Sequence, residues 1–427
     1  MSSTRRVATI DLEFLHRSFY ETVTNAANIK LLELVESKLG EQGISLQDPE
    51  REEILRQITA DPTQLRLSID RDNSDRDLSI KITDEDFGQL NRAISRLEAK
   101  LPELFEQSAT FSAELILKSL KQRWKEESKL QRKEIASFER NLYLRWKRPL
   151  ELLRQFLTMC GELAASYRAE VDLDSARPKL WELLTRLNAR ALRVAEEIFC
   201  LLKTGHADGA LVRWRTVHEI AVTIRFLVKH GEDAAIRYID HQWVGSKKSA
   251  DEYQKVFGDD LESTISQEEL QRLNDGYSAM LNKHGFEFRH DYGWAAKALS
   301  IAKPNFKHIE ESVAASRYRP HYQWASQGLH AGSKGTYAPL SGDAPILLIG
   351  PSNTGLADPA QALSHVLTEI AEDISSLHLS LDALVILKML RTLRDEINEA
   401  FLECHWKLEE DEAKLDASES GSEGALN

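Results

Sequence analysis

Residues 208–231, DGALVRWRTVHEIAVTIRFLVKHG, carry the clearest structural signal in the chain. Apolar residues recur at every third or fourth position between 217 and 227, which is the spacing of one helical face. Asp208 can cap the start of this helix, and Gly231 can supply the left-handed residue that ends it. The pattern therefore predicts an amphipathic helix over residues 209–229.

Helical patterns of the same kind fill most of the 427 residues. A chain of this length exceeds one ordinary hydrophobic core, because domains usually contain roughly 100 to 200 residues. Hydrophobic residues make up 42% of the chain and charged residues 29%, which suffices for packed cores under a charged surface. We therefore predict a mainly α protein of two domains, whose core is a multi-helix bundle.

One amino-terminal segment changes from the helical period to the alternation of a β-strand. Apolar and polar residues alternate at 65–69 and again at 78–82. The run 70–77 between them is rich in Asp, Asn and Ser, which favour turns. We predict a β-hairpin near residues 65–83, which makes the amino-terminal accessory domain a small α+β unit.

A basic segment, 118–148, divides the chain. It contains eleven Lys or Arg residues against four acidic residues, and its apolar residues have helical spacing. We assign residues 1–117 to the accessory domain, 118–148 to a basic amphipathic connecting helix and 149–411 to a helical domain. Residues 412–427 are small, polar and acidic, so we predict a disordered tail.

Charge and composition exclude several classes of protein. The net charge of −13 opposes a protein that coats nucleic acid or anionic lipid with its whole surface, although it permits a local basic patch. No stretch approaches the roughly 20 apolar residues of a membrane span, and the amino terminus lacks the apolar core of a signal peptide. Cys160, Cys200 and Cys404 lie far apart in apolar stretches, as reduced thiols do. We predict a cytoplasmic protein without a membrane segment.

Histidines concentrate in the second half of the chain, where ten of the thirteen lie between residues 206 and 365. Histidine is the commonest metal ligand, so such clustering raises the question of a metal site. The sequence contains no HxxxH, HExxH, HxH or CxxC spacing, and the glycine-rich run 332–336 lacks the spacing of a phosphate-binding loop. We therefore predict neither a metal nor a cofactor.

The helix predicted at 209–229 holds the most suggestive polar residues, Arg213, Arg215, His218 and Glu219. Arg215 and Glu219 are four residues apart and His218 is three from Arg215, so all three share one side of the helix. Arginine can stabilise phosphate charge, and histidine can transfer protons near neutral pH. These four are candidate catalytic residues. A surface ion pair beside a polar histidine explains the same pattern equally well.

A second candidate pair is Ser326 with His330, one helical turn apart. A hydroxyl and an imidazole at this spacing can form a hydrogen bond, as in a nucleophile and its base. Nucleophilic catalysis also needs an orienting acid and an oxyanion hole, and neither is evident nearby. A serine hydrolase is therefore not expected.

These two groups of residues resemble an uncharacterised family, the domain of unknown function 5677 (DUF5677). Residues 215–219 are similar to the Arg-Ser-Leu-x-Glu helix of that family, and Ser326 with His330 is similar to its later motif. The resemblance covers about residues 145–400 and leaves the first third of the chain unexplained.

The DUF5677 family is broadly similar to HEPN-type helical domains, in which an Arg and a His four to six residues apart on one helix cleave RNA without metal. Arg213 with His218 matches this spacing, and Arg225 with His230 matches it too. Trp214 stands where a polar residue usually follows the arginine. The resemblance implies that the histidine moves a proton at the 2′-hydroxyl, that the arginine stabilises phosphate charge, and that two copies face each other in a homodimer.

Two functional hypotheses follow. In the first, the protein acts on or binds RNA or a nucleotide, as a metal-independent endoribonuclease in stress or phage defence, and the basic helix 118–148 tracks the phosphate backbone. In the second, the protein is a non-catalytic interaction module whose amino-terminal domain docks a protein partner and whose helical domain is a scaffold. Convergence of the candidate residues in a polar pocket favours the first hypothesis.

Overall fold

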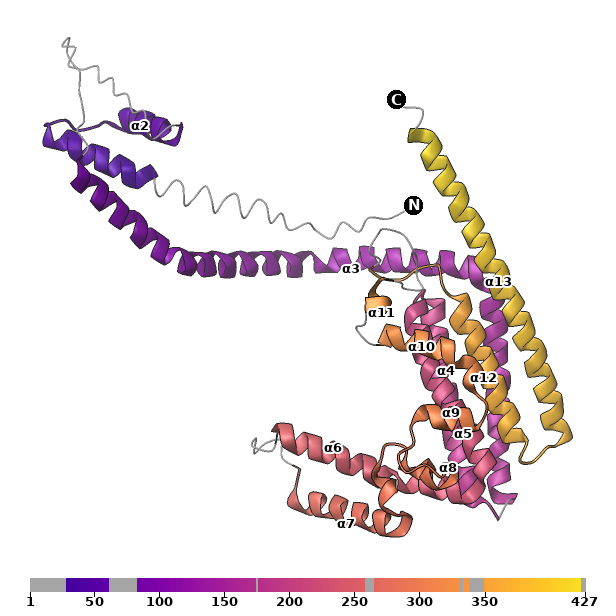
Figure 1. Cartoon of the computed structure of the whole chain (residues 1–427). Coiled ribbons are helices and arrows are strands. Elements are labelled where there is room, and N and C mark those ends of the chain that lie inside the picture. Colours follow the sequence, from indigo (N-terminus) through magenta and orange to yellow (C-terminus); the bar gives the residue numbers. More distant parts are fainter. Residues whose placement is uncertain are drawn as a thin grey trace. The chain divides into compact units, whose positions relative to one another are not determined.

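The computed structural model describes residues 28–60, 83–173, 176–257, 265–329, 333–337 and 349–423 (Figure 1). These residues form helices, turns and connecting loops, and no strand occurs among them, so the prediction of a mainly α protein is confirmed. The hairpin predicted near residues 65–83 falls, apart from Thr83, outside the described residues. No helix in the described ranges is long and apolar enough to cross a membrane.

The chain divides into two compact units, Met1–Lys129 and Leu130–Asn427. In the first unit, a helix over residues 28–41 packs on α2 (Asp48–Ala60) through a small core. The connection between them turns at Gly43, whose φ of +76° lies in the left-handed region. This small core contains Leu32, Val35, Leu39, Ile54 and Ile58.

The long helix α3 (Asp84–Leu173) has a kink at Trp146, with φ −97° and ψ 16°. Pro149 causes the kink, because proline lacks a backbone N–H and its ring collides with the carbonyl of the residue four positions earlier. That carbonyl belongs to Arg145, and it accepts a hydrogen bond from the Sγ of Cys404 at 3.4 Å instead. The boundary predicted between residues 148 and 149 falls within α3, which bends at Trp146 and continues to Leu173.

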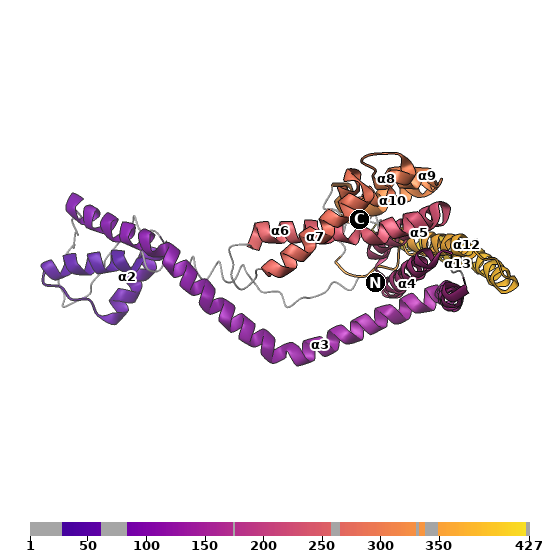
Figure 2. The same cartoon turned by 90° about the horizontal axis from the view of Figure 1, so that it is seen from below.

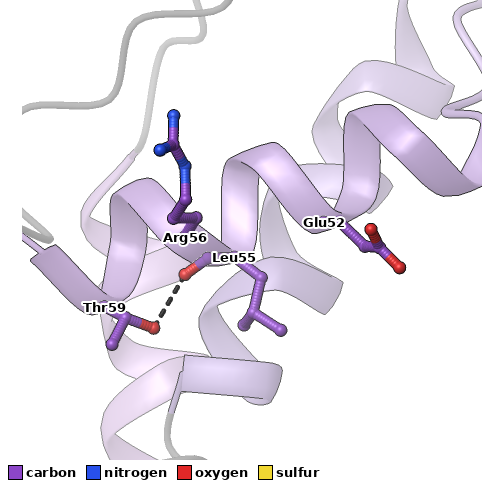
Figure 3. A pocket seen from close by; sticks show the side chains of 4 residues that line it. All are labelled: Glu52, Leu55, Arg56 and Thr59. Atoms are coloured by element: carbon purple, nitrogen blue, oxygen red, sulfur yellow. Dashed lines mark hydrogen bonds between the residues drawn. The ribbon is translucent and has the colours of Figure 1, made fainter.

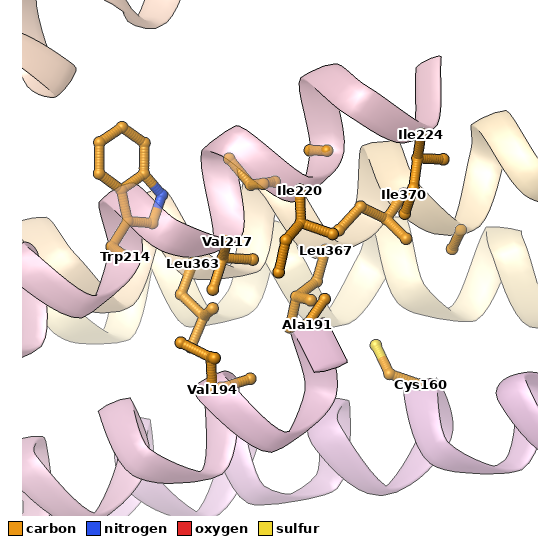
Figure 4. Packing of buried hydrophobic residues seen from close by; sticks show 14 of the residues in the cluster. Cys160, Ala191, Val194, Trp214, Val217, Ile220, Ile224, Leu363, Leu367 and Ile370 are labelled. Carbon is orange, nitrogen blue, oxygen red and sulfur yellow. The ribbon is translucent and has the colours of Figure 1, made fainter. Parts of the chain in front are cut away.

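The second unit is a helical bundle built from the second half of α3 with α4 (Pro178–Lys203), α5 (Ala207–Asp240), α12 (Ala357–Ser375) and α13 (Leu381–Glu423). Figure 4 shows how α5 contributes Val217 and Ile220 to its core, where they lie with Val194 of α4 and Leu367 of α12. Trp146 is fully buried in the same core against Phe401 of α13, with ring centroids 5.7 Å apart.

Shorter elements surround α5. Helices α6 (Gln242–Phe257) and α7 (Gln267–His284) lie side by side (Figures 1 and 2). The chain then passes through η1 (Phe286–Arg289), η2 (Gly293–Ala295), α8 (Ala296–Leu299), α9 (Phe306–Ser312), η3 (Ser316–Tyr318), α10 (Arg319–Leu329) and α11 (Ser333–Tyr337). Helices α9 and α10 both pack against α5, and this packing creates the site described below.

The start of α5 differs from the sequence prediction. Asp208 lies in the first turn and does not cap the helix; the N-cap residue is His206, without a side-chain capping bond. Gly231 has the positive φ that the prediction requires, +72°, but its ψ of −153° is not that of a left-handed helical residue, and α5 bends there and continues to Asp240. The continuation is tied to α4, because the Glu232 carboxylate accepts hydrogen bonds from the backbone N–H groups of Lys179 and Leu180 at 3.0 and 2.8 Å.

At the carboxyl end, α13 runs to Glu423 and therefore passes through most of the acidic segment predicted as a tail. Residues 409–415 consist mainly of Glu, Lys, Leu and Ala, which have high helix propensity. Arg145 on α3 also pairs with Asp411 at 2.8 Å and so ties this part of α13 to the bundle.

Candidate functional site

The most unusual feature of the second unit is a hydrogen-bonded pair of a histidine and a carboxylate inside its core. His218 of α5 and Glu310 of α9 are each 1% exposed, and His218 Nε2 lies 3.0 Å from Glu310 Oε1. A carboxylate only accepts hydrogen bonds, so His218 Nε2–H is the donor. The second oxygen of Glu310 accepts a hydrogen bond from Arg319 Nη1 of α10 at 2.9 Å. One carboxylate thus joins three helices.

Aromatic rings enclose the His218 imidazole. The Trp214 indole stacks on it, with centroids 5.4 Å apart and an interplanar angle of 21°. Tyr318 and Tyr322 lie at 5.6 and 5.7 Å, and Phe306 presents its edge at 6.2 Å. Because rings lie on several sides, the imidazole is shut off from bulk water.

A second carboxylate lies on the outer side of this group. Glu219 Oε1 accepts hydrogen bonds from Arg215 Nε at 3.0 Å and from the Tyr322 hydroxyl at 2.7 Å. The Arg215 guanidinium also lies over the Tyr322 ring, 4.6 Å from its centroid. Burial, and then the bond to Glu219, raise the pKa of Tyr322. We call these six residues the buried network: His218, Glu310, Arg319, Arg215, Glu219 and Tyr322.

The polar contacts continue from Tyr318 towards α12. The Tyr318 hydroxyl donates to Glu369 Oε1 at 2.6 Å, and Arg225 Nη2 donates to Glu369 Oε2 at 3.0 Å. Arg225 Nε also binds both oxygens of Asp373, at 2.8 and 3.2 Å. Burial raises the pKa of Asp373 to about 6, although Arg225 acts in the opposite direction. These contacts fix the position of α12 against α5.

The structure brings together only part of the predicted catalytic set. Arg215, His218 and Glu219 all belong to the buried network, and the predicted Arg215–Glu219 pair is present. Arg213 points elsewhere and forms an ion pair with Glu197 of α4.

The second predicted pair, Ser326 with His330, is not observed as such. The Ser326 hydroxyl donates to the backbone carbonyl of Tyr322 at 2.6 Å, an ordinary bond within a helix. His330 lies outside the described residues. The pairing of Ser326 with His330 therefore remains a prediction.

Sequence reasoning missed half of the network, namely Glu310, Arg319 and Tyr322. Arg319 and Tyr322 are three residues apart and so share one side of α10, which was a readable signal. Glu310 is 92 residues from His218, and no local spacing rule connects them.

Three histidines of the cluster that the structure describes have separate hydrogen-bond partners. His241 Nε2 is 2.8 Å from the carbonyl of His290, His284 Nε2 is 2.7 Å from Asp240, and His365 Nε2 is 2.9 Å from the Asn398 amide. Burial lowers the pKa of His241 and of His365. Within the described ranges, no group of three or more His, Cys, Asp or Glu side chains is placed to hold a metal ion.

A surface hollow of about 450 Å³ on α2 offers no alternative site. Figure 3 shows its four lining residues, Glu52, Leu55, Arg56 and Thr59, which all come from this one helix. Thr59 Oγ1 donates to the backbone carbonyl of Leu55 at 2.8 Å, so its hydroxyl hydrogen is already bonded within the helix. Binding sites usually gather polar groups from several elements, and this hollow does not.

The buried network is thus arranged to hold helices together. Its central charges are compensated inside the protein, which is the condition for keeping a carboxylate in a core. A polymer substrate would have to reach an imidazole that is 1% exposed. The hydrogen bonds to Glu310 therefore fix α5, α9 and α10 against one another.

The part of the chain that contains this network matches a known family model. Residues 182–344 match the model of a family of unknown function, DUF5677, which confirms the resemblance seen in the sequence. No curated protein and no solved structure gives a significant match. The matched residues include all six members of the buried network, while α12 and α13 lie beyond them.

Proposed function

We propose that this chain, whose residues 182–344 form a DUF5677 domain, is a non-catalytic interaction protein. Its amino-terminal unit docks a protein partner through α3, and its helical domain serves as a scaffold. The observation that carries the proposal is a row of large apolar side chains exposed on α3.

This row consists of Leu117, Leu120 and Trp124, with the half-buried Ile116 beside them, and we call these four residues the apolar face of α3. Steps of three and four residues place all four on one side of the helix. Leu117, Leu120 and Trp124 are 49%, 43% and 50% exposed. Contiguous apolar surface of this kind marks an interaction site, because covering it removes apolar area from water.

Charge on the same stretch indicates the chemistry of the partner. Lys118, Lys121, Lys125 and Lys129 follow one another at steps of three and four residues and form a basic row beside the apolar face. A partner with apolar side chains and an acidic rim complements both rows. Nucleic acid would match the lysines and stack on Trp124, but it would leave Leu117 and Leu120 without a role. The combination favours a protein.

The closed network supports the scaffold half of the proposal. Metal-independent RNA cleavage would require an arginine and a histidine at the same phosphodiester. Arg213 is paired with Glu197, and His218 is buried against Glu310. Arg213 is thus engaged in an ion pair at the surface, while His218 is engaged in the core.

The test compares partner capture by the tagged full chain, expressed in its own host, with capture by Leu120→Ser/Trp124→Ser. The control is Leu381→Ser/Leu384→Ser, which removes two apolar residues of α13 that are 76% and 39% exposed. We expect a protein that chemical crosslinking joins to Lys118, Lys121 or Lys125, and that is captured by the wild type and the control but lost from the α3 variant. The purified partner should bind the purified chain with the same variant dependence.

Three outcomes would overturn the proposal. Equal capture by both variants would show that the apolar face is not the docking site. Binding of labelled single-stranded RNA that is lost on Lys118→Glu/Lys121→Glu/Lys125→Glu, but kept by the Leu120/Trp124 variant, would assign this surface to nucleic acid. RNA cleavage by the wild type that His218→Ala abolishes would make the buried network catalytic.

A further inference from the structure

The second unit contains a groove that the proposed function does not use. It lies between α13 and the part of α3 that follows the kink, and its volume is about 620 Å³. This volume falls within the range of small-molecule sites, roughly 300 to 1,000 Å³. Its walls are short, because α3 contributes residues 154–159 and α13 contributes residues 388–393. Each wall is about 9 Å long at the helical rise, which suits a small molecule and is too short to seat a partner helix.

The lining is mainly apolar. Met159 of α3 faces the groove together with Met389 and Leu393 of α13. Methionine side chains are flexible and polarisable, so they adapt to alkyl chains of different shape. Thr158 contributes little polarity, because its hydroxyl already donates to the Arg154 carbonyl at 3.0 Å. A ligand for this surface must therefore carry an alkyl portion.

The charges that line the groove are all positive. Arg154 is held rigidly by α4, since its Nη1 lies 2.7 and 2.9 Å from the two oxygens of Glu196 and its guanidinium lies over the Phe199 ring at 3.9 Å. Lys388 lines the groove from α13, and within the described part of the chain no carboxylate is paired with it. Glu196 compensates Arg154, so Lys388 supplies the net positive charge. An anionic head group would complete its charge balance.

We propose that this groove binds an amphiphilic anion, namely an acyl carboxylate. The carboxylate lies at Lys388, with Arg154 beside it, and the alkyl chain lies over Met159, Met389 and Leu393. Head and tail are recognised separately, so the site requires both the charge and the chain. The groove lies wholly within the second unit, and the inference does not depend on the apolar face of α3.

Calorimetric titration of the full chain tests this assignment with three ligands of equal chain length, decanoate, decanol and decylamine. We expect decanoate to bind at least ten times more tightly than decylamine, with decanol in between, because only the head-group charge differs. Acetate should not bind, because it lacks the chain.

Variants locate the site. Lys388→Glu should weaken decanoate binding at least tenfold, and Met389→Asp should do the same from the tail end. Lys407→Glu is the control, since it makes the same charge change at an exposed position on α13 outside the groove. Circular dichroism and thermal unfolding would confirm that each variant is folded. Equal binding of decanoate and decylamine, or an equal effect of Lys388→Glu and Lys407→Glu, would overturn the proposal.

Discussion

The buried network and the apolar face of α3 depart from ordinary packing in opposite ways. In the network, His218 and Glu310 lie in the core, Arg215, Glu219 and Arg319 lie nearer the surface, and each finds a partner within the same chain. On α3, large apolar side chains face water. Burial of charge is tolerated where the charge is compensated internally, whereas exposed apolar surface is completed by another molecule. The comparison separates a region whose unusual side chains are compensated within the chain from a region for which we propose a protein partner.

The largest loss of stability should come from removing the carboxylate at the centre of the network. Glu310→Ala removes the carboxylate that joins His218 to Arg319, and it leaves the His218 N–H buried without an acceptor. We expect the free energy of unfolding in urea to fall by about 3 kcal/mol. Glu311→Ala is the control, because Glu311 pairs with Lys307 at the surface and its loss should change stability by less than about 0.5 kcal/mol. Equal effects of the two variants would remove the distinction between the regions.

A smaller effect should appear as a pH dependence at Asp373. Burial raises its pKa to about 6 in the folded chain, whereas an unfolded aspartate titrates near 3.9. Between these values the folded state holds a proton that the unfolded state has released, so the contribution of Asp373 to stability falls as pH rises from about 4 to 6.

Comparison with Asp373→Asn measures this contribution. The unfolding free energy of the wild type, relative to that of the variant, should decline by on the order of 2 kcal/mol across this window and then level off. A difference that increases with pH would show that the pairing with Arg225 outweighs burial.

Removal of one hydroxyl should have a still smaller effect. Tyr322→Phe deletes the bond to Glu219 but leaves Glu219 paired with Arg215, so we expect a loss of about 1 kcal/mol. Tyr143→Phe is the matched control, because Tyr143 makes the same kind of bond to Glu151 at an exposed position. The control should change the unfolding free energy by a few tenths of a kcal/mol at most. Equal losses would show that the network is open to water.

The smallest effect on stability is expected on α3 itself. Leu120→Ser/Trp124→Ser alters side chains that are about half exposed and lie outside the cores, so the unfolding free energy should stay within about 0.5 kcal/mol of the wild type apart from the small difference in helix propensity. Denaturant unfolding of the variant tests this directly. A large loss would mean that the apolar face is covered within the chain, and docking would lose its basis.

The sequence predicted the structure best where the relevant interaction joins residues that are close together in the chain. The helix at 209–229 follows from the apolar spacing alone, and the positive φ of Gly231 follows from its position after the last apolar residues. Its continuation to Asp240 could not be read in this way. It is tied to the bond between Glu232 and the start of α4, more than 50 residues earlier in the chain.

The candidate site shows the same limit. Arg215 and Glu219 are one turn apart, so their ion pair was predictable from spacing. The position of Arg213 was ambiguous, because a residue two places before Arg215 projects in another direction, and only the neighbouring helix determines its partner. Glu310 has no local relation to His218. Tertiary packing brings the two together, and the sequence of α5 alone does not indicate this contact.

Accessibility of His218 to a small reagent tests the central claim most directly. Native full-length protein would be treated briefly with diethyl pyrocarbonate, and the modified histidines would be identified by mass spectrometry. His206 and His378, which are exposed, should be modified readily, whereas His218 should remain unmodified until the protein is unfolded. Modification of His218 at the rate of His206 would contradict the account, because it would show that the imidazole faces water and is available for chemistry.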